Sequence, residues 1–247
     1  MTNICLKVSY DGTNFSGFQL QAGNIPTIQG ALEAALNRIY RQPVRITAAG
    51  RTDAGVHALG QVVNYPAPFY IPVDKIPRAI NSLVPREIVV WEAEKRSARF
   101  HARFSARKKF YSYTLDRAPF PRVMKRRYTW HCPFSLDLGA MAEGASLLGG
   151  RHDFSAFRAR GSSTGSPVKT LHRVLVINLP DQQLLRFTFE GEGFLYKMVR
   201  LMVGSLIRVG RGRLRPVDLA EALAGRQPGA VGPVAPPRGL CLEKVEY

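Results

Sequence analysis

The sequence predicts an α+β fold, and two repeating patterns support this. Over residues 4–10, apolar side chains occupy every second position, as in a strand with one buried face. Over residues 28–39, apolar side chains recur at every third or fourth position, as in a helix with one buried stripe. Patterns of both kinds alternate through the two halves of the chain, so strands and helices are expected to be interleaved.

Turn and capping residues bound the elements of the first half. Residues 11–14 (Asp-Gly-Thr-Asn) end the first strand as a turn, and Thr27 is the expected N-cap of the helix that follows Pro26. Further along we expect strands at 44–48 and 59–65, a short helix at 74–83 and a strand at 87–93.

A second set of strands and helices begins near Ser105, which divides the chain into expected subdomains 1–104 and 105–247. Asp137 is the expected N-cap of a helix that reaches Leu148. The other expected elements are a hairpin of strands 171–179 and 183–190, a helix at 193–207, a helix from Pro216 to Gly225 and a strand at 240–245.

The charge of the chain indicates a polyanionic partner. Its 247 residues include 35 Lys and Arg against 18 Asp and Glu, a net charge of +17, and 45% of them are apolar, as in a globular protein. Nucleic acid is expected rather than a membrane, because no run of 18 apolar residues exists and residues 1–7 lack the apolar core of a signal peptide. Cys5, Cys132 and Cys241 have no C-x-x-C spacing, which argues against disulfides and zinc and favours the cytoplasm.

Residues 95–127 combine positive charge with aromatic side chains. They contain twelve Lys or Arg and one acidic residue, Asp116, with aromatic residues threaded among them. Cations bind phosphates and aromatic rings stack on bases, so the segment suits RNA. The alternative is a strand with aromatic side chains in a core and cations in water, and for Phe104 and Tyr113 we favour that core position.

A short loop carries the candidate catalytic residue. Residues 49–58 read Ala-Gly-Arg-Thr-Asp-Ala-Gly-Val-His-Ala and lie between two expected strands. Gly50 and Gly55 allow tight turns on either side of Asp53, and a loop on a rigid frame is a common place for a reactive carboxylate. On these residues alone, Asp53 could equally cap a turn and pair with Arg51.

Motifs for nucleotide, metal or flavin chemistry do not occur in the sequence. Residues 12–17 have the glycine spacing of a P-loop but continue with Phe18, and residues 210–212 lack the third glycine of a dinucleotide fingerprint. The five histidines show no metal-ligand spacing, and the aspartates are too scattered for a metal-dependent nuclease. We therefore expect no cofactor and no metal, which leaves a carboxylate acting with a cation and an aromatic ring.

Several motifs together resemble those of the TruA family of tRNA pseudouridine synthases. Beside the loop at 49–58, the matching segments are 10–13, 17–19, 27–30, 100–103, 109–113, 152–154, 194–200 and 203–206, in the family's order over essentially the whole chain. The A-G-R-T-D-x-G-V-H-A loop in this company is highly specific. Phe18 stands where the family usually has tryptophan, and because both side chains are bulky and aromatic, only local packing is expected to differ.

The resemblance implies a fold, an activity and a site. The fold is two subdomains of mixed, mainly antiparallel sheet with helices on the outer faces, joined around a basic central cleft, in a homodimer that holds tRNA. The activity is cofactor-independent isomerisation of uridine to pseudouridine at tRNA positions 38, 39 and 40 in the anticodon arm. Asp53 matches the catalytic aspartate, Tyr111 the tyrosine that packs on the target uracil, Arg200 the arginine that pairs with the aspartate, and Arg51 an arginine beside the flipped nucleotide.

The chemistry agrees with these roles and leaves some alternatives open. An ionised carboxylate could attack C6 of uracil, attack C1′, or take the C2′ proton on a glycal route, and the sequence does not choose among them. Burial disfavours ionisation of a carboxyl group, and an arginine within ~4–6 Å opposes that effect. For Arg200, the alternative to pairing with Asp53 is a solvated arginine that contacts phosphate. For the protein, the alternative to an enzyme is a non-catalytic tRNA-binding protein on the same scaffold.

Overall fold

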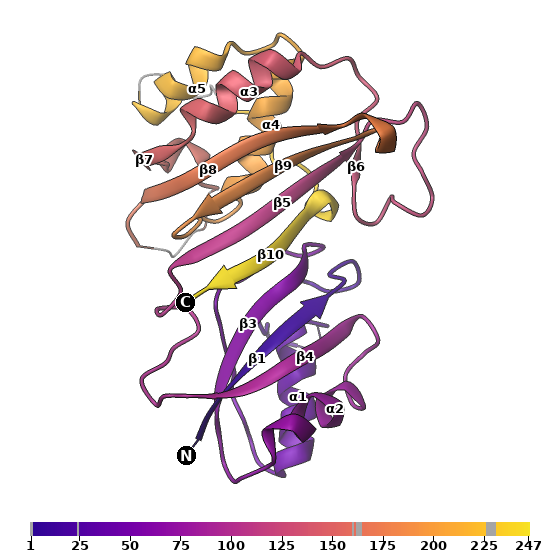
Figure 1. Ribbon diagram of the computed structural model, residues 1–247, viewed down its shortest axis with the longest axis vertical. Helices are drawn as coiled ribbons and strands as arrows, with labels where there is room; N and C mark the ends of the chain where they lie inside the picture. Colours follow the sequence, from indigo (N-terminus) through magenta and orange to yellow (C-terminus); the bar gives the residue numbers. More distant parts are fainter. Residues whose placement is uncertain (1, 24, 160, 162–164, 226–230) are drawn as a thin grey trace. The chain divides into compact units, whose positions relative to one another are not determined.

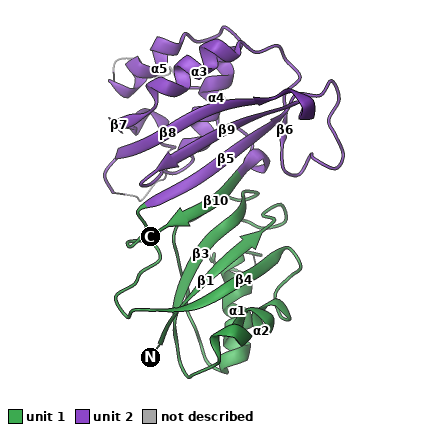
Figure 2. Ribbon diagram, in the orientation of Figure 1, with its two compact units in different colours: residues 1–107, 241–247 green, residues 108–240 purple. Residues whose placement is uncertain are grey.

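The computed structural model describes residues 2–23, 25–159, 161, 165–225 and 231–247. The chain forms two compact units, one of Met1–Arg107 with Cys241–Tyr247 and one of Lys108–Leu240 (Figure 2). The subdomain boundary expected near Ser105 stays a prediction, and each unit is described by itself.

The first unit is a sheet with two helices against one face (Figure 1). Its strands follow the order β4-β1-β3-β10, with β2 paired to β3. β1 is antiparallel to both β3 and β4, whereas β10 is parallel to β3. The elements are β1 (Thr2–Tyr10), α1 (Ile28–Tyr40), β2 (Thr47–Ala48), β3 (His57–Ala67), α2 (Ile76–Asn81), β4 (Ile88–Arg96) and β10 (Leu240–Glu246).

The second unit is likewise built from a series of paired strands, with three α-helices among its described residues. Its strands follow the order β5-β9-β8-β7, all antiparallel, and β6 is parallel to β5. The elements are β5 (Lys108–Asp116), β6 (Trp130–His131), α3 (Leu138–Leu147), β7 (Gly150–Asp153), β8 (Val168–Leu179), β9 (Leu184–Gly191), α4 (Met198–Gly210) and α5 (Pro216–Leu223). The predicted α+β class with mainly antiparallel strands is therefore confirmed.

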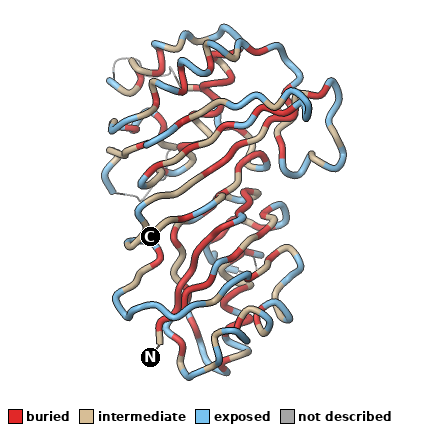
Figure 3. The backbone as a smooth tube through the Cα atoms, in the orientation of Figure 1, coloured by how far each residue is buried: buried red, intermediate tan, exposed pale blue. Residues whose placement is uncertain are grey.

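Local rules place several of these elements where the sequence predicts them. Thr27 caps α1, its Oγ1 accepting a hydrogen bond from Gly30 N at 3.1 Å. Asp137 caps α3 in the same way, with Oδ1 at 2.9 Å from Ala140 N. The β8–β9 hairpin turns through a short 3₁₀ segment and a left-handed Gln183 (φ 50°). The buried backbone runs along the central strands of each sheet (Figure 3).

The strand predicted at residues 44–48 is wrong for most of its length, because only Thr47–Ala48 pairs with β3. The preceding backbone is bound to α1 instead of to a strand. Val44 N donates to Asn37 Oδ1 at 2.6 Å, and Ile46 N donates to Glu33 Oε1 at 3.1 Å. Polar side chains of the helix thus satisfy the amides that a strand would have used.

The helix predicted from residue 193 begins later, at Met198. Lys197 has a left-handed backbone (φ 58°), which no α-helix interior accommodates. Leu195 is buried ahead of it, and its amide donates to Met198 Sδ at 3.4 Å. The helix predicted at 74–83 is likewise divided into a 3₁₀ turn (Val73–Lys75) and α2. Among the described residues, no helix combines the length and the apolar character required to cross a bilayer.

The cap of α3 gives a test of local stability. Asp137→Ala should lower the free energy of unfolding by about 1 kcal/mol, because the Ala140 amide loses its acceptor. Asp137→Asn is the matched control, since asparagine caps helices as well as aspartate does. Urea unfolding of the three proteins measures both effects, and equal losses in the two variants would contradict the role given to the side-chain oxygen.

Candidate active site

The loop between β2 and β3 carries Asp53 in the first unit. Thr52 before it is buried, Asp53 itself is half-buried, and Arg51 is exposed. The turn closes with a hydrogen bond from Val56 N to Asp53 O at 3.1 Å, and Gly55 has a positive φ of 75°. This turn therefore fixes the backbone that follows Asp53, residues 54–56.

A neighbouring segment, residues 12–18, supports this loop through backbone hydrogen bonds. Phe18 N donates to Thr52 O at 3.0 Å, and Gly55 N donates to Phe15 O at 3.3 Å. Gly17 has a φ of 96°, and a Cβ on it would lie 2.9 Å from Thr52 O, so only glycine fits there. The motif at residues 17–19 therefore has a structural explanation, which is close backbone support of the Asp53 loop.

A buried hydrogen-bond chain supports the loop from its N-terminal side. Tyr10 Oη lies 2.8 Å from Thr52 Oγ1, and Gln61 Nε2 donates to Tyr10 Oη at 3.3 Å and to Gly50 O at 2.8 Å. Burial raises the pKa of Tyr10, so the phenol stays neutral and links Gln61 to Thr52 by hydrogen bonds. The sequence did not predict the supporting roles of Gln61 and Thr52. The only signal for Gln61 was a polar residue within a mainly apolar strand.

His57, at the start of β3, fastens the turn at residues 11–13 rather than a ligand. Its ring is buried, and its Nδ1 lies 3.2 Å from both Gly12 N and Asp11 Oδ1. Asp11 Oδ1 in turn accepts a hydrogen bond from Thr13 N at 3.0 Å. The Gly12 amide can only donate and the Asp11 carboxylate can only accept, so Nδ1 hydrogen-bonds to one of the two at a time, according to whether it carries a proton.

Tyr111 lies on β5 of the second unit, in register with Phe189 of β9. It is 8% exposed, and its ring meets that of Phe194 edge to face at 5.0 Å between centroids. This contact fixes the orientation of the tyrosine ring relative to the strand.

Arg200, on α4 of the second unit, is held by residues that sequence reasoning missed. Its Nε donates to Ala235 O at 2.7 Å, and Ala235 N donates to Arg200 O at 3.1 Å. Burial raises the pKa of Tyr113, whereas nearby Arg200 and Arg238 lower it in part. The Tyr113 hydroxyl donates to Pro236 O at 2.8 Å. The guanidinium is thus bonded to the chain at Ala235, and Tyr113 holds the next residue, Pro236.

Glycines bring that segment against α4. Ser205 Oγ accepts a hydrogen bond from Gly232 N at 2.8 Å and donates to Leu201 O at 2.8 Å. A Cβ on Gly204 would overlap the carbonyl of Pro233, so the helix must be bare at this position. The motif at residues 203–206 therefore serves to dock residues 231–236 beside Arg200.

The four predicted site residues divide between the units. Asp53 and Arg51 belong to the first unit, and Tyr111 and Arg200 belong to the second. The pairing of Arg200 with Asp53 and the basic cleft stay predictions.

The two aromatic residues that we placed in a core behave differently. Tyr113 is buried as predicted, but Phe104 is 76% exposed, so its core position is wrong. The ring of Phe104 lies 4.3 Å from that of His101, and the Arg103 guanidinium lies 5.5 Å from its centroid. Sequence pattern did not reveal this because residue 104 precedes the strand instead of belonging to it.

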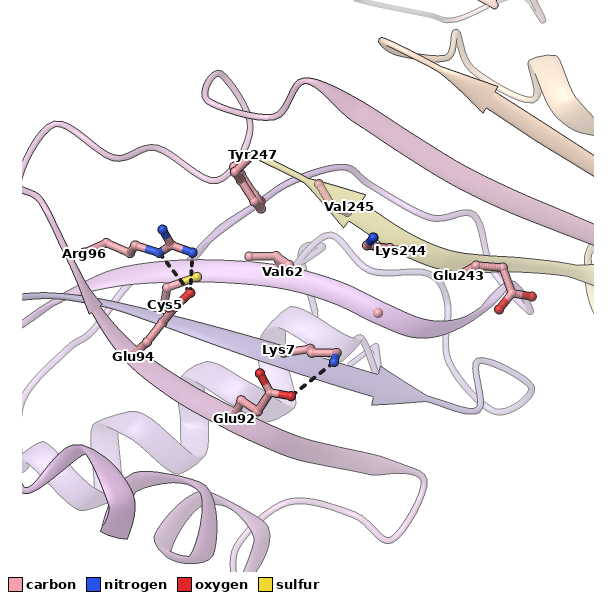
Figure 4. Close-up of a pocket in the computed structure, with 11 residues that line it drawn as sticks. Cys5, Lys7, Val62, Glu92, Glu94, Arg96, Glu243, Lys244, Val245 and Tyr247 are labelled. Carbon is pink, nitrogen blue, oxygen red and sulfur yellow. Dashed lines mark hydrogen bonds and ion pairs between the residues drawn. The ribbon is translucent and has the colours of Figure 1, made fainter. Parts of the chain in front are cut away.

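The first unit also has a hollow of about 330 Å³ on its sheet, away from Asp53 (Figure 4). Four of the charged side chains that line it form two pairs, Lys7 with Glu92 at 3.1 Å and Arg96 with Glu94 at 2.7 Å. Burial, and then the charge of Glu94, raises the pKa of Cys5 to about 12, which makes this thiol a poor nucleophile. Within the described ranges, no three His, Cys, Asp or Glu side chains come together as a metal site would require.

Comparison with known proteins gives a consistent result. A family model described as tRNA pseudouridine synthase matches residues 7–105 and 145–247. The chain is 45% identical to tRNA pseudouridine synthase A of Moorella thermoacetica, over 98% of this chain and 99% of that one. It is 42% identical to the protein of that name from Geobacillus kaustophilus (97% and 92% covered) and 41% identical to that from Brevibacillus brevis (100% of both). A chain of the solved structure titled "Crystal Structure of a Cbf5-Nop10-Gar1 Complex" covers 82% of this chain, and this chain covers 54% of it, at 11% identity and a TM-score of 0.34, a likeness too low to support a conclusion.

The close approach at Gly17 can be tested against a second glycine. Gly17→Ala should lower the free energy of unfolding by about 1–3 kcal/mol more than Gly23→Ala does. Both glycines have a positive φ, 96° and 81°, so both alanines carry backbone strain, but only at Gly17 would the new Cβ meet other backbone. Chemical denaturation measures the difference, and similar losses would show that Thr52 O does not crowd this position.

Proposed function

The chain belongs to the tRNA pseudouridine synthase family, as an isomerase that converts uridine to pseudouridine in tRNA, and we propose that it acts at positions 38, 39 and 40 of the anticodon arm. We further propose that Asp53 is the catalytic carboxylate. The observation that carries this assignment is the support of the Asp53 loop by backbone and buried side chains on both flanks.

Support of that kind matters because the reaction must hold one nucleotide through a large rearrangement. The N1–C1′ bond breaks, uracil turns, and a C5–C1′ bond forms while the base stays bound. A carboxylate that attacks C6 or C1′, or that takes the C2′ proton, must keep its position relative to the ribose in each route. The fixed turn around Asp53 provides such a position.

We assign the other site residues to holding the flipped nucleotide and the charge of the carboxylate. Tyr111 would pack on the target uracil, and its contact with Phe194 supports this because it fixes the ring. Arg200 would pair with Asp53 and keep it ionised, and the Nε bond to Ala235 O supports this because it restricts the guanidinium. Arg51, exposed next to Asp53, would contact the backbone of the flipped nucleotide.

Membership of the same family supports proposals on substrate binding, assembly and location. The net charge of +17 supports tRNA as the partner through phosphate contacts. We propose a homodimer in the cytoplasm, with no resident metal or cofactor, and light scattering of the purified protein tests the dimer. A non-catalytic tRNA-binding role is the alternative, but the relatives are named as synthases.

Asp53→Asn should abolish pseudouridine formation and leave tRNA binding intact. Asparagine keeps the shape of the side chain and removes the negative charge that each route requires. Release of label from uridine carrying tritium at C5 measures turnover, and filter binding measures affinity. Asp74→Asn, at an exposed aspartate of the same unit, is the control. Turnover near the wild-type level in Asp53→Asn would refute the catalytic assignment.

Arg200→Met should slow the chemical step most at low pH. Without the cation, protonation of the partner carboxylate becomes easier, so the acid limb of the rate profile moves to higher pH. Arg200→Lys is the matched variant, because it keeps the charge and loses the planar fork, and it should fall between Met and wild type. Single-turnover rates with saturating enzyme give the profiles. Weaker binding with an unchanged pH profile would instead indicate a phosphate contact.

A further inference from the structure

A long loop connects β5 to β6 (Figure 1). It exposes basic and apolar side chains together. We call residues 119–128 the basic tip. Within it, Phe120 and Met124 are 80% and 87% exposed, and Arg126 and Arg127 are exposed with them. The basic tip contains no acidic residue. Large exposed apolar groups beside cations are typical of an interaction surface.

A buried ion pair fixes the base of this loop. Asp116 is 1% exposed and accepts hydrogen bonds from Arg122 Nε at 3.1 Å, from Arg122 Nη2 at 2.6 Å and from Ala118 N at 3.1 Å. Arg122 Nη1 also donates to Gln182 O at 2.9 Å, in the turn between β8 and β9. His131 Nε2 lies 2.8 Å from Ala118 O on the returning side of the loop. These hydrogen bonds therefore fix the part of the loop from which the basic tip extends.

This fastening holds at neutral pH. Burial raises the pKa of Asp116, but hydrogen bonds from Arg122 and Ala118 outweigh burial and leave the pKa below its ordinary value. A carboxyl group with a lower pKa in the folded chain stabilises the fold above the unfolded pKa of about 3.9, and that effect is lost as the pH falls through the folded pKa.

The tip itself is an internally bonded turn. Arg126 N donates to Arg122 O at 2.9 Å, and Tyr128 N donates to Lys125 O at 2.9 Å. Thr129 Oγ1 donates to the same carbonyl at 2.9 Å. Because backbone groups are bonded within residues 122–128, the exposed Met124 lies on a formed turn.

We propose that the basic tip is a further tRNA-binding surface, which contacts the tRNA outside the reacting nucleotide. The inference rests on the function proposed above. Lys125, Arg126 and Arg127 would contact phosphates, and Phe120 and Met124 would pack on an unstacked base or a ribose. The matched regions of the family model, 7–105 and 145–247, leave this loop out, so the comparison does not assign it a role.

Charge favours RNA over a second copy of the chain at this surface. In a two-fold contact each patch meets itself, so Lys125, Arg126 and Arg127 of one tip would face the same cations of the other with no acidic group of the tip between them. A polyanion meets the same patch with opposite charge.

The test compares two pairs of substitutions with a control pair. Lys125→Gln with Arg126→Gln removes two charges from the tip, and Phe120→Ala with Met124→Ala removes its apolar groups. Lys75→Gln with Arg78→Gln removes two exposed charges from the region of α2 and is the control for the overall field. Filter binding of an unmodified tRNA transcript with uridine at position 39, over a salt series, gives the affinity, and single-turnover rates with saturating enzyme give the chemical step.

Both tip variants should bind tRNA at least about tenfold more weakly than the control, with the saturating rate kept. The charge variant should also reduce the salt slope by about two, one for each cation. Affinity equal to that of the control overturns the proposal, and so does loss of dimer mass in Phe120→Ala with Met124→Ala, which would assign the tip to self-association. Wild-type protein that binds tRNA but forms no pseudouridine would refute the proposed function, while the affinity comparison would still decide the role of the tip.

Discussion

The candidate active site depends on contact between two backbones, that of residues 12–18 and that of the Asp53 loop. Two amide-to-carbonyl bonds and the bare Cα of Gly17 hold the segments together at a distance that no side chain would permit. Buried Tyr10 and Gln61 add hydrogen bonds to the N-terminal side of the loop, and burial keeps the Tyr10 phenol neutral by raising its pKa. The carboxylate that we propose as catalytic therefore requires no large element of its own, because the rest of the first unit positions the turn that bears it.

The second unit uses the same device on a helix. Gly204 admits the carbonyl of Pro233, Ser205 binds the amide of Gly232, and Ala235 then holds Arg200 through both backbone and side chain. In each unit, glycines permit one stretch of chain to lie directly on another, and a side chain that we propose for the active site is next to that junction. A geometry set by backbone is less adjustable than one set by side-chain packing, which suits residues that must keep their position during bond rearrangement.

Patterns read from the sequence predicted what depends on near neighbours. The caps at Thr27 and Asp137, the β8–β9 hairpin and the alternating strands are local matters, and the structure has them. The 44–48 strand failed because its amides are bound by side chains of a helix before it, and the start of α4 failed because Lys197 is left-handed. For the candidate site, motifs predicted roles for Asp53 and Arg200, which stay predictions. The supporting contacts of Gln61 and Ala235 join distant segments, which periodicity does not encode.

The pairing of β10 with β3 sets an order of events during synthesis. Cys241 and Leu242 lie in parallel register with His57 and Ala58, directly after the Asp53 loop, so this neighbour of the loop is translated more than 180 residues later. Contacts across so long a stretch form late, because closing the intervening chain costs entropy before the contact is gained. A nascent chain on the ribosome thus holds the Asp53 loop long before β10 can pair with β3, and this side of the loop gains its neighbouring strand only after residues 241–242 have been made.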